Sequence, residues 1–203
     1  MIHNYTPRPF GAKTGRAFSA SANVAQPHRR LLADAVVACA GLVLPSSALT
    51  SELVEFMQGG VSLLVGTRSA DLRPVGRRAF GARIDVADSA ATVFVPACGA
   101  ERLLANLKGN GQVAATFARP MDSRALQIKG HCLTVHETTA AERVVQDRYF
   151  AAFSAALVML GQEPKLMRRV RYFPSYAVTF RIDSMFEQTP GPGAGRDVGQ
   201  GLG

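Results

Sequence analysis

The chain has 203 residues, of which 47% are hydrophobic, so it can bury a sizeable core and is not disordered as a whole. Its net charge of +8 is uneven: residues 1–46 carry five basic residues and one acid, and the rest carries 18 basic residues and 14 acids. The body is therefore only mildly basic, which does not favour nucleic-acid binding, and no run reaches the roughly 18 apolar residues of a membrane helix.

The three cysteines, Cys39, Cys98 and Cys132, lie far apart and form no CxxC pair. An odd number without a framework favours free thiols in a reducing compartment. We therefore expect a cytoplasmic protein.

Residues 1–46 are expected to form a leader, either disordered or folded as a loosely packed helix. The first 30 residues contain no acid. An export signal is an alternative, because His28-Arg29-Arg30 precedes the apolar run LLADAVVACAGLVLP. Asp34 interrupts that run, which argues against a signal, and an amphipathic helix over Leu31–Leu44 fits it about as well.

Residues 47–186 are expected to form one domain of short strands and a few helices. Thr50 is the expected N-cap of the helix SELVEFMQ, which ends at Gly59-Gly60. A second helix is expected at Gly99–Lys108. The expected strands are Val61–Arg68, Val75–Ile84, Ala91–Val95, Gln112–Phe117, Ala125–Val135 and Ser175–Asp183.

Two helices are expected between the fifth and sixth strands. Thr139 and Glu142 form a capping box that opens the longer one. Apolar residues recur along this helix at helical spacing, which predicts one apolar face. A shorter helix is expected to begin at Pro164. The predicted face consists of Val145, Tyr149, Phe153, Ala156 and Leu160.

This order predicts a mainly β fold with flanking helices (α+β), arranged as a six-stranded antiparallel split β-barrel. Parallel units would need a crossover helix between most strand pairs, and only one pair has one before Thr139. Residues 187–203 are rich in glycine and proline and are expected to form an extended or mobile C-terminal tail.

Arginines near a helix start are the clearest site signal. Arg77 and Arg78 lie in the second predicted strand, and Arg102 lies in the first turn of the following helix. Helix N-termini and guanidinium groups both bind phosphate, so the sequence predicts an anion site. Since strand side chains alternate, Arg77 and Arg78 should point to opposite faces.

Other chemistries find little support in the residues. His131 and His136 are five residues apart on one predicted strand, so they face opposite sides and form no metal pair. No metal site is predicted, and no nucleophile with a partner histidine can be assembled. No catalytic residue is assigned.

Several segments together resemble the pyridoxamine 5′-phosphate oxidase-like FMN-binding split barrels. They are RPVGRRAFGARID, VFVP, GAERLLANLKGNGQVAATF and ALQIKG. The resemblance covers Leu49 to Gly195. It implies a homodimer with FMN at the subunit interface and a small-molecule substrate, with neither nucleic acid nor membrane as a partner.

The resemblance also implies a set of cofactor-binding positions. Arg77 occupies the place of a phosphate-binding arginine, and Arg102 keeps a cation at the helix start. Pro96 replaces a threonine, and Glu101 places a carboxylate where the family has a basic residue. The expected cofactor-binding set is Arg77, Arg78, Ala79, Phe80, Val95, Pro96, Arg102 and Gln127.

The resemblance favours an FMN-dependent oxidoreductase. The family's C-terminal Arg-x-His signature and its tryptophan are absent, so the substrate should differ from pyridoxine phosphate. Two alternatives stay open: a non-catalytic flavin- or haem-binding, stress-related protein, and a deazaflavin-dependent reductase. Haem would involve His131 or His136.

Overall fold

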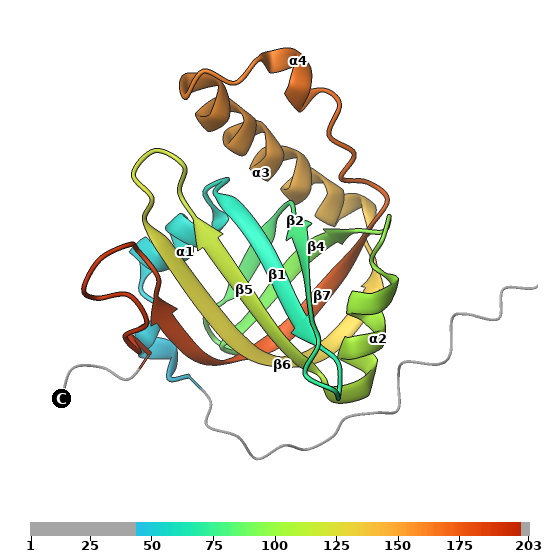
Figure 1. Ribbon diagram of the computed structural model, residues 1–203, viewed down its shortest axis with the longest axis vertical. Helices are drawn as coiled ribbons and strands as arrows, with labels where there is room; N and C mark the ends of the chain where they lie inside the picture. The colour runs from blue at the N-terminus through green and yellow to red at the C-terminus, as the bar shows by residue number, and fades with distance from the viewer. Residues whose placement is uncertain (1–43, 200–203) are drawn as a thin grey trace, which may run out of the picture. The chain divides into compact units, whose positions relative to one another are not determined.

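The computed structural model describes residues 44–199 (Figure 1). The expectations for the leader, the export signal and Cys39 lie outside the described residues, apart from the last three residues of the leader range. Within the described part, no helix is both long and apolar enough to cross a membrane.

Seven strands, four α-helices and one 3₁₀ turn follow one another along the chain (Figure 1). The strands are β1 (Ser62–Arg68), β2 (Pro74–Ala79), β3 (Ala82–Asp85), β4 (Ala90–Pro96), β5 (Gln112–Ala118), β6 (Ala125–Glu137) and β7 (Ser175–Glu187). The helices are η1 (Ser46–Ala48), α1 (Ser51–Gln58), α2 (Glu101–Asn110), α3 (Ala140–Met159) and α4 (Pro164–Met167).

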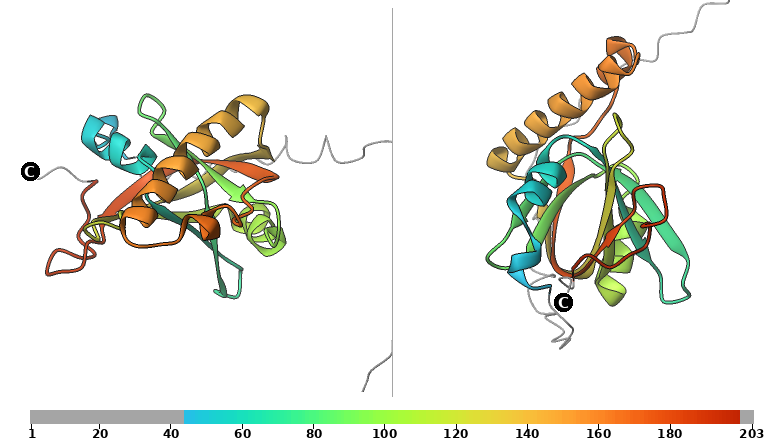
Figure 2. Two further views of the ribbon diagram at one scale, coloured as in Figure 1. Left: turned by 90° about the horizontal axis from the view of Figure 1, so that it is seen from above. Right: turned by 90° about the vertical axis from the view of Figure 1, so that its left-hand side faces the viewer.

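The strands form one antiparallel sheet in the order β2-β1-β5-β6-β7-β4-β3, curled into a barrel (Figure 2). The expected count of six strands is wrong, because the predicted strand Val75–Ile84 is divided into β2 and β3. The sheet is open, and its two edge strands are consecutive in the chain.

The division occurs at Phe80 and Gly81. The Phe80 N–H donates to the Phe94 carbonyl oxygen (2.9 Å), and the Phe94 N–H donates to the Gly81 carbonyl oxygen (3.1 Å). Gly81 has φ +122°, a conformation that L side chains rarely adopt. The chain thus turns away from β1 at this point and pairs with β4 instead, which splits the barrel.

The core lies inside the barrel. Leu63 and Val65 of β1 are buried while Leu64 between them is half exposed, as the period of two requires. Phe94, Phe117 and Phe180 are fully buried in the interior. Each such side chain contributes on the order of 1.5–3 kcal/mol through burial.

The predicted helix starts are confirmed. The Thr50 hydroxyl oxygen accepts a hydrogen bond from the Leu53 N–H (3.4 Å) at α1, and Thr139 and Glu142 form the capping box of α3. The buried side of α2 includes Leu103 and Leu107.

The predicted apolar face of α3 is buried only in part. Only Tyr149 and Phe153 of that set are buried, and the other buried positions are Glu142 and Gln146. The helix extends beyond the barrel (Figure 2), so Leu160 just past its end is exposed. The part of α3 that covers the barrel packs partly through polar side chains, which hydropathy alone does not reveal.

The described part of the tail folds back along β7, which itself runs four residues further than predicted. The Val198 N–H donates to the Met185 carbonyl oxygen (2.8 Å), and the Gln188 N–H donates to the Ala125 carbonyl oxygen (2.8 Å). These bonds bring the tail to the end of the barrel where β6 begins.

Candidate functional site

The start of α2 is the first candidate site, and Arg77 lies against it. The Arg77 guanidinium donates from Nη2 to the carbonyl oxygen of Cys98. Gly99 has φ +72°, and a Cβ there would lie 2.5 Å from Arg77 Nη2. The turn therefore needs glycine both for its backbone angle and for the guanidinium packed on it.

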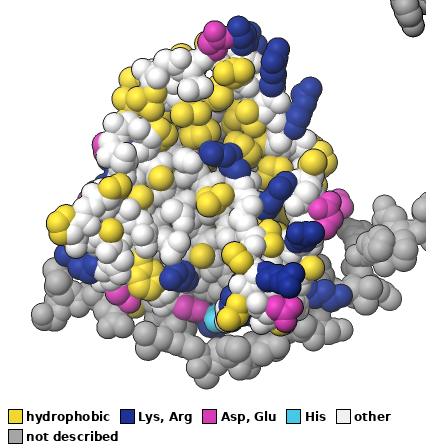
Figure 3. Space-filling model, viewed as in Figure 1, with side chains coloured by type: hydrophobic (Ala, Val, Ile, Leu, Met, Phe, Trp, Pro, Cys, Tyr) yellow, Lys and Arg dark blue, Asp and Glu magenta, His cyan; other side chains and the backbone are white. Residues whose placement is uncertain are grey.

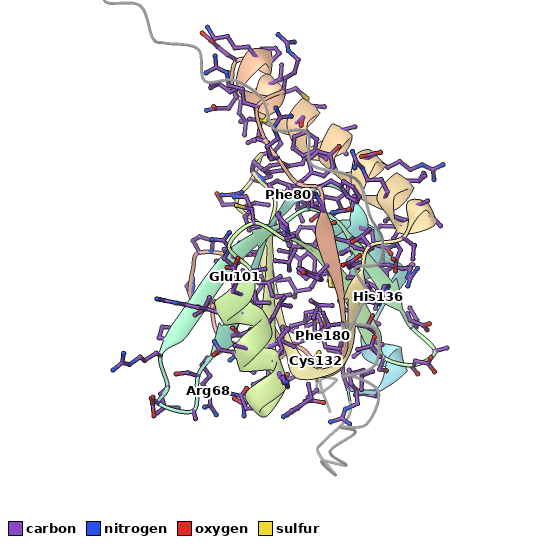
Figure 4. The ribbon with its side chains drawn as sticks, turned by 90° about the vertical axis from the view of Figure 1, so that its right-hand side faces the viewer. Arg68, Phe80, Glu101, Cys132, His136 and Phe180 are labelled. Carbon is purple, nitrogen blue, oxygen red and sulfur yellow. The ribbon has the colours of Figure 1, made fainter. Side chains whose placement is uncertain are left out.

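No side chain caps the first turn of α2, because its N-cap is Ala100. The unpaired N–H groups and the helix dipole of such a turn favour an anion. Glu101 and Arg102 are both exposed there, so the turn carries one carboxylate and one cation of its own. Figure 4 shows Glu101 at the beginning of the helix.

The donors around this turn fit a phosphate group. Arg77 supplies a guanidinium, the helix supplies backbone N–H groups, and Arg102 adds a second cation next to them. Pro96 ends β4 immediately before the turn, and its partner in the sheet is Ser175. The structure therefore gathers Arg77, Pro96 and Arg102, from the predicted set, around one turn.

Two other predicted residues lie inside the core. Val95 pairs with Tyr176 and is fully buried, and Ala79 is 1% exposed. Both side chains belong to the hydrophobic core.

Arg78 and Phe80 lie elsewhere. Arg78 points to the opposite face of β2 from Arg77, as predicted, and donates from Nη1 to the Ser62 hydroxyl oxygen (3.1 Å). The Phe80 ring packs edge-on against Phe150, with 5.6 Å between ring centroids. Figure 4 shows Phe80 below α3.

Arg78 and Phe80 line a second candidate site, a cavity of about 640 Å³. Its walls come from the barrel, from the loop between β5 and β6, from α3, from α4 and its following turn, and from the tail. The lining residues are Ser62, Arg78, Phe80, Ala118, Arg119, Pro120, Ser123, Ala125, Phe153, Leu157, Met167, Val170, Gln188 and Pro190.

Gln127 lies apart from the α2 turn. Its Nε2 donates to the Thr116 hydroxyl oxygen (2.9 Å) on the neighbouring strand. The sheet register places Arg78, Leu64, Thr116 and Gln127 in one row across β2, β1, β5 and β6. Gln127 therefore shares the outer face with Arg78.

The two histidines of β6 have different carboxylate partners. His131 Nδ1 lies 2.6 Å from Asp183 Oδ2, and the other Asp183 oxygen accepts from Arg181 Nε (2.8 Å). His136 Nε2 lies 3.1 Å from both carboxylate oxygens of Glu142. Within residues 44–199, no group of three potential ligand side chains is placed to hold a metal ion.

The His131 imidazole borders a hollow of about 460 Å³ on the outer face of the sheet. Residues of β1, β5, β6 and β7 surround it, including Gly66, Lys129 and Ser184. No local pattern in the sequence pairs His131 with Asp183, because the two are joined only by the register of β6 and β7.

The cavity below α3 and α4 was also not predicted from the sequence. Arg119 and Pro120 follow the predicted strand Gln112–Phe117, and Gln188 belongs to the predicted tail. The two arginines of the cavity, Arg78 and Arg119, are the sequence feature that could have indicated a site. Nothing in their spacing along the chain relates one to the other.

No protein-family model matches the chain, and no curated protein matches its sequence. Solved structures do resemble it. HupZ from Group A Streptococcus is 16% identical, with a TM-score of 0.44, covering 72% of this chain and 98% of that one.

Two more solved structures are similar to the chain. A "putative pyridoxamine 5′-phosphate oxidase" from Lactobacillus delbrueckii is 17% identical, with a TM-score of 0.43 over 68% of this chain and 93% of that one. An F420 reductase is 16% identical, with a TM-score of 0.43 over 64% and 93%. At these identities and TM-scores, no cofactor, substrate or residue role is carried to this chain. The family that the sequence motifs indicated is nevertheless represented among the structures that the chain resembles.

Proposed function

We propose that this chain binds FMN and acts as an oxidoreductase on a small molecule other than pyridoxine phosphate. The observation that carries the proposal is the contact of Arg77 with Cys98 and Gly99, in the turn that leads directly into the uncapped start of α2. A guanidinium beside unpaired helix N–H groups forms a phosphate site that needs no hydroxyl donor.

The phosphate end of FMN would be held by Arg77, by the backbone of Glu101 and Arg102, and by the Arg102 guanidinium. The first turn of α2 would orient it through its N–H groups. The bound flavin would supply electron transfer to or from the substrate, and the protein would supply orientation and electrostatics. The Glu101 carboxylate opposes a dianion here, and added salt should screen this repulsion together with the attraction of Arg102.

We also propose that the chain forms a homodimer through the outer face of β1, β2 and β5. Leu64 is 50% exposed at the centre of this face. Arg78 and Thr116 flank Leu64 in its row, and the next outward-facing row consists of the small residues Gly76, Gly66 and Ala114. A flat face with a protruding leucine suits contact with a second copy. Sedimentation of the native chain and of Leu64→Glu tests this, and two equal monomers would contradict it.

Flavin titration tests the proposed cofactor site. The purified chain is scanned for a two-band flavin spectrum, stripped, and titrated with FMN. Arg77→Met and Arg102→Glu should each weaken FMN binding about tenfold or more, since a hydrogen bond to a charged group contributes roughly 1.5–3 kcal/mol. Arg78→Met is the matched control, because Arg78 is the next residue and points to the opposite face.

An unchanged FMN affinity in both Arg77→Met and Arg102→Glu would reject the α2 site. Parallel titration with a deazaflavin distinguishes an FMN-binding protein from a deazaflavin-dependent one. Binding of the deazaflavin alone would favour the second. Reduction of the bound flavin by a reduced nicotinamide would support turnover.

A second candidate function is haem binding through His131. The observation that favours it is the contact of the Asp183 carboxylate with His131 Nδ1. Proteins commonly orient a metal-ligating imidazole in this way. The adjoining hollow of about 460 Å³ lies within the usual range for a ligand pocket, about 300–1,000 Å³. His136 fits less well, since Glu142 occupies its Nε2.

A further inference from the structure

The cavity below α3 and α4 has walls that are mostly apolar. Phe80 closes it on the barrel side, Phe153 and Leu157 come from α3, and Met167 and Val170 come from α4 and the turn after it. Figure 3 shows hydrophobic side chains gathered between the barrel and the α3–α4 segment. A ligand in this cavity needs an apolar body.

The cavity also has one cation without a carboxylate partner. Of its two arginines, Arg119 is neutralised by Asp122, whose carboxylate oxygens accept from Arg119 Nε at 2.9 and 3.0 Å. The bond to Arg119 holds the pKa of Asp122 at about 2, so this pair stays charged near neutral pH. Among the described residues, Arg78 bonds only the Ser62 hydroxyl and has no acidic partner.

The wall opposite α3 is held in place by the tail. The Gln188 N–H donates to the Ala125 carbonyl oxygen (2.8 Å), and the Ala125 N–H donates to the Thr189 hydroxyl oxygen (3.0 Å). These bonds fix Gln188 and Pro190 at the cavity before any ligand arrives. A preformed wall lowers the entropic cost of binding.

We propose that this cavity binds a monocarboxylate with an apolar body, an aromatic or a fatty acid, with its carboxylate on Arg78. A guanidinium and a carboxylate pair in a two-pronged geometry, and the single unpartnered guanidinium sets the ligand charge at one. The volume of about 640 Å³ is that of a ligand pocket rather than a packing defect. The site is separate from the FMN proposal, because Arg77 and Arg78 lie on opposite faces of β2.

Three probes define the ligand class by calorimetry on the full chain. Naphthalene-2-carboxylate and dodecanoate represent the aromatic and the fatty acid, and naphthalene-2-carboxamide has the shape of the first without its charge. We expect at least one acid to bind, and the amide to bind more weakly. Whichever acid binds more tightly shows whether the ligand is an aromatic acid or a fatty acid.

Two pairs of variants locate the site. Arg78→Met should weaken acid binding about tenfold or more and leave amide binding unchanged, because only the charged hydrogen bond is lost. Arg77→Met is its matched control on the other face. Leu157→Trp should block both ligands by filling the cavity, whereas Leu160→Trp, which is on the exposed side (48%) and does not line it, should not.

Three results would overturn the proposal. They are the absence of acid binding at millimolar concentration, an equal effect of Arg78→Met and Arg77→Met, and full binding by Leu157→Trp. None of them bears on FMN titration, so the two proposals fail separately.

Discussion

His131 and Asp183 face each other across β6 and β7, with 2.6 Å between Nδ1 and Oδ2. Arg181 holds the other carboxylate oxygen at 2.8 Å, so Asp183 is fixed from two sides. The imidazole is about one third exposed, at the edge of the hollow on the outer face of the sheet. Asp183 therefore orients His131 without removing it from solvent.

This arrangement predicts which histidine would ligate haem. If the purified chain takes up hemin with a Soret band, His131→Ala should abolish the band and His136→Ala should leave it. Asp183→Asn should weaken hemin binding about 10- to 100-fold, the usual effect of losing an orienting partner. A Soret band that survives His131→Ala would contradict the assignment.

Gly81 is predicted to be essential to the division between β2 and β3. Its φ of +122° is strained for any other residue, and a Cβ there would lie 2.7 Å from the Phe94 ring. Gly81→Ala should lower the free energy of unfolding by about 1–3 kcal/mol, measured by urea denaturation. Gly76→Ala is the control, because a Cβ at Gly76 meets nothing within 4 Å, and an equal loss in the two variants would reject this explanation.

Glu142 should make stability depend on acid pH. Burial acts to raise its pKa, but hydrogen bonds from Thr139 and His136 outweigh it and hold the pKa below its ordinary value. A pKa that is lower in the folded chain gives stability that is complete above the unfolded pKa, about 4.3, and lost as the pH falls through the folded one.

Melting temperatures measured from pH 7 to 3 test this linkage. The native chain should lose stability below about pH 4.3, and the loss should be smaller in Glu142→Gln, which lacks the titrating group. The exposed Glu137→Gln serves as the control. Identical pH profiles for the native chain and Glu142→Gln would contradict the prediction.

Gln146 offers a substitution that should stabilise the chain. This side chain of α3 is fully buried. Its Oε1 accepts from the Ser175 hydroxyl (2.9 Å), and its Nε2 has no partner among the described residues. Ser175 also bonds the Thr138 hydroxyl (2.9 Å), so its oxygen stays paired without Gln146.

Gln146→Met should therefore raise the free energy of unfolding by about 1 kcal/mol, since it removes an unsatisfied amide and keeps the volume. Thermal and urea denaturation measure the change. Ser175→Ala is the counter-variant: it leaves both Gln146 and Thr138 without this partner and should destabilise. A loss of stability in Gln146→Met would show that the amide is satisfied.

Local sequence patterns determined much of the fold. Thr50, Thr139 and Glu142 marked helix starts, because caps act within one turn of the chain. The alternation around Val178, Phe180 and Ile182 marked the last strand, because its period depends only on the backbone. The opposite directions of Arg77 and Arg78 followed from the same rule.

Tertiary structure decided the rest, because it depends on contacts between distant segments. The strand Val75–Ile84 divides at Gly81 only because Phe94 offers a new partner there. The buried face of α3 contains Gln146 because Ser175 lies opposite it. Members of the predicted cofactor set are divided between the Arg77 turn, the Arg78 cavity, the core and the outer sheet face. The walls of the cavity come from five parts of the chain, and no local pattern encodes their meeting.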